Sequence, residues 1–229
     1  MRNITVGFLL IILLPPVFSA DIDKVYHPYV MPMEREFEWR LTSRQSDKGN
    51  ELFQRLAYGH ALSEFVTVEA YLVGERDVSD NFGVASYEIE TRWMLAEQGQ
   101  YWLDTGLLFE LEKAHEMDAW EFAIGLLNEK ELGKTSLTTN LFVVHHFGSD
   151  NDESLSAEFR LKYRYRWRPE VQPAIEFYTS KAFTGIGPAF MGIIRLNGQQ
   201  QIKWESAFIT GLNGNSKDHS LRFAIEYEF

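Results

Sequence analysis

Apolar and polar residues alternate with a period of two along much of this chain. Between Leu155 and Trp167, every odd-numbered position is apolar or aromatic, and every even-numbered position is polar or charged. Strict alternation of this kind indicates a β-strand with two different faces. The stretch is longer than a usual strand of about five or six residues. Its length suits a tilted strand that crosses a lipid bilayer, which needs about nine to eleven residues.

The same alternation recurs and predicts about twelve strands. They are expected at 36–41, 52–58, 65–75, 87–93, 103–112, 120–126, 136–147, 155–167, 171–179, 188–196, 200–212 and 221–229. Short turns are expected at 59–64, 97–99, 132–134, 168–170 and 197–198, and longer polar loops at 45–51, 76–81, 113–118, 148–154, 180–187 and 213–218. The two kinds of connection alternate, which predicts a single all-β, up-and-down antiparallel transmembrane β-barrel with its short turns in the periplasm.

The positions of the tryptophans predict which face of the barrel meets lipid. Once strand directions are assigned, most of them fall near the short turns: Trp39, Trp93, Trp102, Trp167 and Trp204. Aromatic side chains gather at this level where a membrane meets water. The apolar face is therefore expected to point outward and the charged face into the lumen. A register slip that pointed Arg160 or Arg164 toward the hydrocarbon of the membrane would cost roughly 2–4 kcal/mol for each charge.

The last eleven residues, 219–229, alternate and end on an aromatic residue, with Tyr227 two positions before Phe229. This ending resembles the terminal strand of Gram-negative outer-membrane β-barrel proteins, although no specific family is identified. The resemblance implies export and insertion into the outer membrane. It implies outer-membrane lipid and the barrel assembly machinery as partners, the latter reading Tyr227 and Phe229 as an assembly signal. It implies no catalytic residue.

The first twenty residues differ from the rest of the chain. Arg2 is followed by an apolar run from Val6 to Leu14 and then by two prolines and small residues. This order predicts a secretory signal peptide over 1–20. The barrel is expected over 34–229. Residues 21–33 carry two prolines and are expected to form a short periplasmic segment, with a plug that folds into the lumen as the alternative.

The composition excludes several kinds of chemistry. The chain has 33 acidic and 22 basic residues and a net charge of −11, so nothing here would neutralise the phosphates of a nucleic acid. It has no cysteine, which excludes disulfides and thiolate metal sites. Adjacent His145 and His146 point to opposite faces of a strand and cannot both bind one metal. No cofactor and no metal site are expected.

The predicted lumen carries charges of both signs. A basic ladder is formed by Arg160, Lys162, Arg164 and Arg166, and Glu88, Glu90 and Arg92 lie on another wall. One interpretation is a charged permeation path. The electric field between the basic and acidic walls would orient a solute that passes through it. The other is an ion-pair network that fills a narrow interior, because buried charges must be paired. If the lumen conducts, its acidic excess predicts a preference for cations.

These features favour a non-enzymatic outer-membrane barrel that acts as a narrow pore or a structural envelope protein, with an unknown solute. One alternative is a lipid or ester hydrolase, in which His146 is the base, Ser156 the nucleophile and Glu158 the orienting acid. A second alternative is a soluble periplasmic β-barrel that binds a ligand in an apolar interior.

Overall fold

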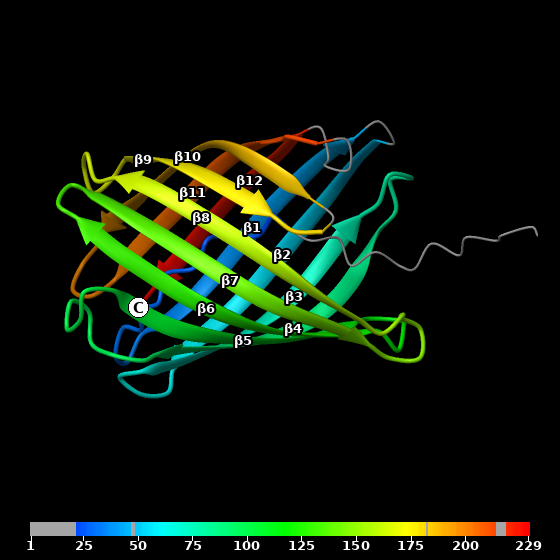
Figure 1. Ribbon diagram of the computed structural model, residues 1–229, viewed down its shortest axis with the longest axis horizontal. Helices are drawn as coiled ribbons and strands as arrows, with labels where there is room; N and C mark the ends of the chain where they lie inside the picture. The colour runs from blue at the N-terminus through cyan, green and yellow to red at the C-terminus, as the bar shows by residue number, and fades with distance from the viewer. Residues whose placement is uncertain (1–21, 47–48, 182, 214–218) are drawn as a thin grey trace, which may run out of the picture.

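The computed structural model describes residues 22–46, 49–181, 183–213 and 219–229, so the predicted signal peptide lies outside the described residues. These residues form one closed barrel of twelve antiparallel strands, in which each strand pairs with its neighbours in sequence (Figure 1). The strands are β1 (Arg35–Ser46), β2 (Gly49–Ala61), β3 (Val66–Arg76), β4 (Phe82–Met94), β5 (Asp104–Ala114), β6 (Trp120–Leu132), β7 (Thr135–Phe147), β8 (Ser154–Tyr165), β9 (Gln172–Thr179), β10 (Thr184–Arg195), β11 (Gln201–Gly211) and β12 (His219–Glu228). The predicted fold class is confirmed. No helix among the described residues is long and apolar enough to cross a membrane.

The barrel closes between β1 and β12. Trp39 lies opposite Ile225 and Arg40 opposite Ala224 in an antiparallel register. Beyond this ladder, the Phe229 N–H donates to the Arg35 carbonyl oxygen at 2.9 Å. The C-terminal strand therefore closes the sheet, and no strand edge is left to pair with another chain.

The two faces of the wall have opposite character, as the alternation predicts. On β8, Tyr163 is 45% exposed on the outside, whereas Arg160 is only 7% exposed on the inside. Elsewhere on the wall, Ile89 is 53% exposed, whereas its neighbour Glu90 is 1% exposed. An apolar exterior around a charged interior suits a lipid bilayer. It does not fit the alternative of a soluble barrel with an apolar interior.

The connections at the two ends of the barrel differ less than the sequence suggests. The turn end, on the left in Figure 1, carries the connections 62–65, 95–103, 133–134, 166–171 and 196–200. The loop end carries the described connections 77–81, 115–119 and 148–153, and β1–β2, β9–β10 and β11–β12 also meet at this end. The expected contrast between short turns and long loops is absent, because several strands run beyond their predicted bounds. Polar residues continue a β-ladder as well as they form a loop once the strand has left the bilayer.

Candidate functional site

The lumen is occupied by the segment before β1, residues 22–33, which we call the plug. Ile22, Val25, Tyr26 and Val30 are each 5% exposed or less. Figure 1 shows this stretch in blue inside the ring of strands. Its placement corrects the expectation of a periplasmic segment outside the barrel and matches the alternative of a plug.

A tight turn sends the plug into the lumen. The Glu34 N–H donates to the Met31 carbonyl oxygen at 3.2 Å, which closes a four-residue turn just before β1. Pro32 occupies the second position, where its fixed φ angle is favourable. Met33 occupies the third position with a φ of 63°. Because the turn reverses the chain, the residues before it run back through the barrel.

Asn140 on β7 binds the main chain of the plug. Its Oδ1 accepts a hydrogen bond from the Tyr26 N–H at 2.8 Å, and its Nδ2 donates to the Tyr26 carbonyl oxygen at 2.8 Å. Asn140 is completely buried. One amide side chain thus satisfies both polar groups of a residue that has no neighbouring strand.

Apolar side chains of the plug pack against three parts of the wall. Near the loop end, Ile22 and Val25 belong to a cluster with Tyr178 and Ile209. Midway, Tyr26 packs edge-on against Phe142, with ring centroids 6.3 Å apart. The Tyr26 cluster also contains Leu108, Ala123, Leu127 and Val144. Near the turn end, Val30 packs against Ala61 and Met94.

The carboxylate of Asp23 lies among arginines from the wall. It forms a close ion pair with Arg40, and its Oδ2 lies 3.4 Å from Arg160 Nη1 and 3.8 Å from Arg55 Nη1. Arg222 donates to the main-chain carbonyl oxygen of Asp23 at 2.7 Å. We call Arg40, Arg55, Arg160 and Arg222 the arginine cluster. All four are buried and come from four different strands, β1, β2, β8 and β12.

Each arginine of the cluster also pairs with a carboxylate of the wall. The pairs are Arg40–Glu38 at 2.5 Å, Arg55–Glu88 at 3.0 Å, Arg160–Glu158 at 3.0 Å and Arg222–Glu176 at 2.9 Å. These pairs compensate charge that would otherwise be costly to bury. The cluster therefore keeps its geometry from the wall itself, and the plug is an additional partner.

The charge ladder expected from the sequence is paired, and it faces the interior except at Arg166, which lies past the end of β8 and pairs with the exposed Glu131. Lys162 reaches Glu205 at 3.4 Å, Arg164 reaches Glu129 at 3.0 Å, Arg166 reaches Glu131 at 2.6 Å and Arg92 reaches Glu69 at 2.8 Å. Glu90 lies 2.5 Å from the Tyr26 hydroxyl. This part of the interior has the character of an ion-pair network. The network surrounds the plug.

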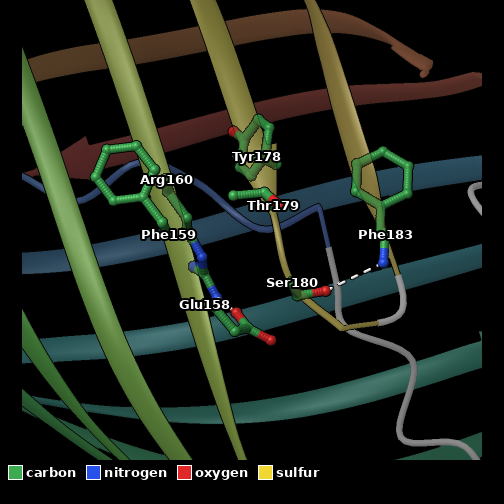
Figure 2. Close-up of a pocket in the computed structure, with 7 residues that line it drawn as sticks. All are labelled: Glu158, Phe159, Arg160, Tyr178, Thr179, Ser180 and Phe183. Carbon is green, nitrogen blue, oxygen red and sulfur yellow. Dashed lines mark hydrogen bonds and ion pairs between the residues drawn. The ribbon is translucent and has the colours of Figure 1, made fainter. Parts of the chain in front are cut away.

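A pocket beside the plug opens between β8 and β9 near the loop end (Figure 2). Glu158, Arg160, Tyr178 and Phe183 are among its lining residues, and the dashed line in Figure 2 marks the Phe183 N–H donating to Ser180 Oγ at 3.2 Å. It has room for about one water molecule. The pocket therefore has no room for a solute larger than water.

The structure does not place the hydrolase residues as a triad requires. The β7–β8 register sets His146 opposite Ser154, whereas Ser156 lies opposite Val144. His146 Nδ1 is 3.2 Å from a carboxylate oxygen of Glu121 on β6. Glu158 pairs with Arg160. Ser156 is therefore offset by two residues from the position opposite His146.

Two groups of carboxylates in the lumen are close enough to share a cation. They are Glu34, Glu36, Glu226 and Glu228, and Glu88, Glu110 and Glu112. Lys203 pairs with Glu34 at 3.7 Å and with Glu226 at 2.9 Å. Arg55 pairs with Glu88. Side-chain cations of the wall thus serve both groups.

The predicted tryptophan girdle is found mainly at the turn end. Trp93 is the penultimate residue of β4, Trp102 lies in the 95–103 connection and Trp167 follows β8. Trp204 lies near the start of β11, and Trp39 lies further into β1. Tyr227 stacks on Phe229 with ring centroids 5.5 Å apart on the outside of the closing strand. Their reading by an assembly machinery stays a prediction.

Sequence reasoning did not identify Asp23, Tyr26 or Asn140 as a group. Asn140 stands at an inward position of its strand, which predicts that it is buried but not what it binds. The signal that could have found the plug is apolar: Ile22, Val25, Tyr26 and Val30 would have no reason to recur in a solvated tail.

No protein-family model and no curated protein matches this chain. Solved structures do. The COG4313 outer membrane channel from Pseudomonas putida F1 is 14% identical with a TM-score of 0.59, over 91% of this chain and 100% of that chain. The KdgM porin in complex with disordered oligogalacturonate is 10% identical with a TM-score of 0.54, over 85% of this chain and 98% of that chain. At these identities the likeness concerns the fold alone, and the chain has the fold of an outer-membrane β-barrel.

Proposed function

We propose that this protein is a narrow pore of the outer membrane, closed in the present conformation by residues 22–33. The observation that carries the proposal is what fills the lumen. The interior of a purely structural barrel is filled by side chains of its own strands, as in the smallest barrels. Here a separate, non-strand segment occupies it, held by hydrogen bonds and ion pairs to a charged wall.

Such contacts can be exchanged for contacts with water. If the plug leaves, Asn140 and the arginine cluster become hydrated, and each arginine keeps its carboxylate partner on the wall. The lumen that remains is lined by charges and is suited to water and small polar solutes. A preference for cations over anions among small ions stays a prediction from the acidic excess.

The test is planar-bilayer conductance of the refolded full chain with its plug weakened by Asn140→Leu. Leucine has a similar volume but leaves the buried N–H and carbonyl of Tyr26 unpaired, at about 1–3 kcal/mol for each group. We expect the open-time fraction to rise at least about tenfold above that of the unaltered chain.

The matched control is Asn128→Leu. Asn128 also lies in a strand, but it faces outward, and its Oδ1 accepts a hydrogen bond from the Thr105 hydroxyl at 3.0 Å instead of binding the plug. It should leave the conductance unchanged. Folding is checked for both variants by heat-modifiable migration on a gel. A folded Asn140→Leu protein that stays silent would identify a structural envelope barrel instead of a pore.

A further inference from the structure

The arginine cluster converges on a carboxylate that does not belong to the wall. In three of its members, one nitrogen binds the wall acid and another binds Asp23. Arg40 donates through Nε to Glu38 at 2.7 Å, while its Nη1 pairs with Asp23. Arg160 uses Nη2 for Glu158 and Nη1 for Asp23. Arg222 uses Nη2 for Glu176 and Nη1 for the Asp23 carbonyl oxygen.

This division of donors means that the wall presents guanidinium N–H groups toward the axis even after its own charges are paired. A guanidinium has five N–H donors in a fixed plane and matches the geometry of a carboxylate. Three strands, β1, β8 and β12, supply these donors to Asp23, two to its carboxylate and one to its main-chain carbonyl oxygen. Holding a short plug in place does not require this many, since Asn140 and the apolar clusters already bind it.

An apolar ring site adjoins the cluster. The Tyr26 hydroxyl lies 2.6 Å from Asp23 Oδ2 and 2.5 Å from Glu90, and the Tyr26 ring packs edge-on against Phe142 within its apolar cluster. Arg160 lies over the Phe142 ring, with its guanidinium carbon 4.5 Å from the centroid. The plug thus offers the wall a ring in an apolar site and a carboxylate directly beyond the edge of that ring.

We propose that the arginine cluster and the Phe142 site bind a small organic acid that carries a carboxylate beside a flat apolar ring. In the closed state, Asp23 and Tyr26 occupy the place of this acid. Solute and plug exclude one another, so that the solute shifts the pore toward its open state. This inference rests on the proposed pore function.

The inference specifies a local anion site in an interior with an acidic excess. The two are compatible because the anion site is set by the guanidinium groups closest to it, although acids also lie on the same strands, such as Glu38 on β1 and Glu158 on β8. Glu69, Glu88, Glu90 and Glu110 lie on β3, β4 and β5, whereas the arginine cluster lies on β1, β2, β8 and β12. A carboxylate that takes the place of Asp23 is attracted by these guanidinium groups at short range, whatever the net charge of the whole lumen.

The test measures phenylacetate binding to the full-length protein by titration calorimetry in detergent. Asp23→Asn removes the competing carboxylate and keeps the shape of the plug. We expect it to bind phenylacetate at least about tenfold more tightly than the unaltered chain does, since a charge-assisted hydrogen bond contributes about 1.5–3 kcal/mol. Asp80→Asn is the matched control: its side chain is 83% exposed in the 77–81 loop, and asparagine tolerates its positive φ of 68°. It should leave the affinity unchanged.

Three further probes define the class of ligand. Phenylacetamide has the ring without the charge, acetate has the charge without the ring, and inorganic phosphate is a generic anion. Each should bind Asp23→Asn at least about tenfold more weakly than phenylacetate. Equal binding of phenylacetamide or phosphate would overturn the proposal. Adding Arg160→Gln should abolish phenylacetate binding; if that double variant does not fold, the comparison of phenylacetate with phenylacetamide still decides.

Conductance separates this inference from the function on which it rests. Phenylacetate should raise the open-time fraction of the unaltered chain, and phenylacetamide should not. If Asn140→Leu conducts but Asp23→Asn does not bind phenylacetate, the pore function is supported and the proposed ligand site is ruled out. If phenylacetate binds selectively but no variant conducts, the ligand site is supported and the pore function is ruled out.

Discussion

Met33 is the residue that fixes the direction of the plug. It holds a φ of 63° in the turn that joins the plug to β1. L-residues pay roughly 1–2 kcal/mol for this left-handed conformation, and asparagine tolerates it best among residues other than glycine. The turn stays closed because the contacts of the plug exceed this cost. Its stability should therefore respond directly to the side chain at position 33.

Met33→Val should loosen the plug, because a β-branched residue is a poor fit to a positive φ angle. Met33→Asn is the matched variant and should not loosen it. The readout is tryptic cleavage after Lys24, which lies in the plug and is held by a 2.6 Å ion pair to Glu38. If valine costs about 1–2 kcal/mol more than asparagine in this conformation, cleavage should be roughly 5–30 times faster in Met33→Val than in Met33→Asn. Equal rates in the two variants would show that the turn does not control the plug.

Residue-level reasoning from the sequence was reliable wherever a residue belonged to a strand. Arg160, Lys162, Glu88 and Glu90 face the lumen as alternation predicts. It failed for Asp23 and Tyr26, because a plug that runs through a barrel has no period of its own. Its contacts join residues more than a hundred positions apart, such as Tyr26 and Asn140, and no local pattern encodes such pairs. The offset between His146 and Ser156 depends on the length of the β7–β8 hairpin loop, and the composition of the chain does not determine that length.

At the scale of elements, the strands were predicted well and the connections less so. The extended β1–β2 hairpin is the clearest case. Polar residues predicted a loop at 45–51, yet β1 continues to Ser46 and β2 begins at Gly49. The alternation that identifies a strand within the bilayer fades where both faces meet water. Strand ends beyond the membrane therefore look like loops in sequence.

Two connections at the loop end are joined to each other. Asp118 in the 115–119 loop accepts hydrogen bonds through Oδ2 from the Ser149 hydroxyl at 2.8 Å and the Ser149 N–H at 3.1 Å. The Asp118 N–H in turn donates to Asp150 at 2.7 Å. Gly148 permits this approach with a φ of 124°, since a Cβ there would lie 2.1 Å from the Asp118 carbonyl oxygen.

This pairing predicts a pH dependence outside the membrane. Hydrogen bonds from Ser149 hold the pKa of Asp118 below its ordinary value of about 3.8. Because the pKa of Asp118 is lowered, the contact contributes fully to the stability of the two loops at a pH above the ordinary pKa. This contribution is lost as the pH falls through the lowered pKa. Hydrogen-exchange protection of the Ser149 amide, corrected for intrinsic rates, should fall below about pH 3.8. In Asp118→Asn, the hydrogen-exchange protection of the Ser149 amide should be lower and independent of pH. If this protection still decreases as the pH is lowered in that variant, another group causes the effect.

At the scale of the whole molecule, the sequence specifies a barrel with lipid outside and charge inside, and the structure adds the closed state. Orientation could be predicted because one misplaced strand face would bury several charges in hydrocarbon, an energy large enough to fix the register. The occupation of the lumen could not be predicted, because the plug is held by separate hydrogen bonds, ion pairs and apolar contacts to residues far away in the sequence.

A disulfide between plug and wall tests the central claim most directly, and the chain contains no other cysteine to interfere. A Cβ added to Gly106 on β5 would lie 3.1 Å from the Pro28 Cβ, slightly closer than the roughly 3.5–4.5 Å of a disulfide. Full-length Pro28→Cys/Gly106→Cys should therefore crosslink when oxidised. In planar bilayers, we expect the oxidised protein to be silent and the same protein to show openings after reduction. Equal conductance before and after reduction would contradict the claim that residues 22–33 close the pore.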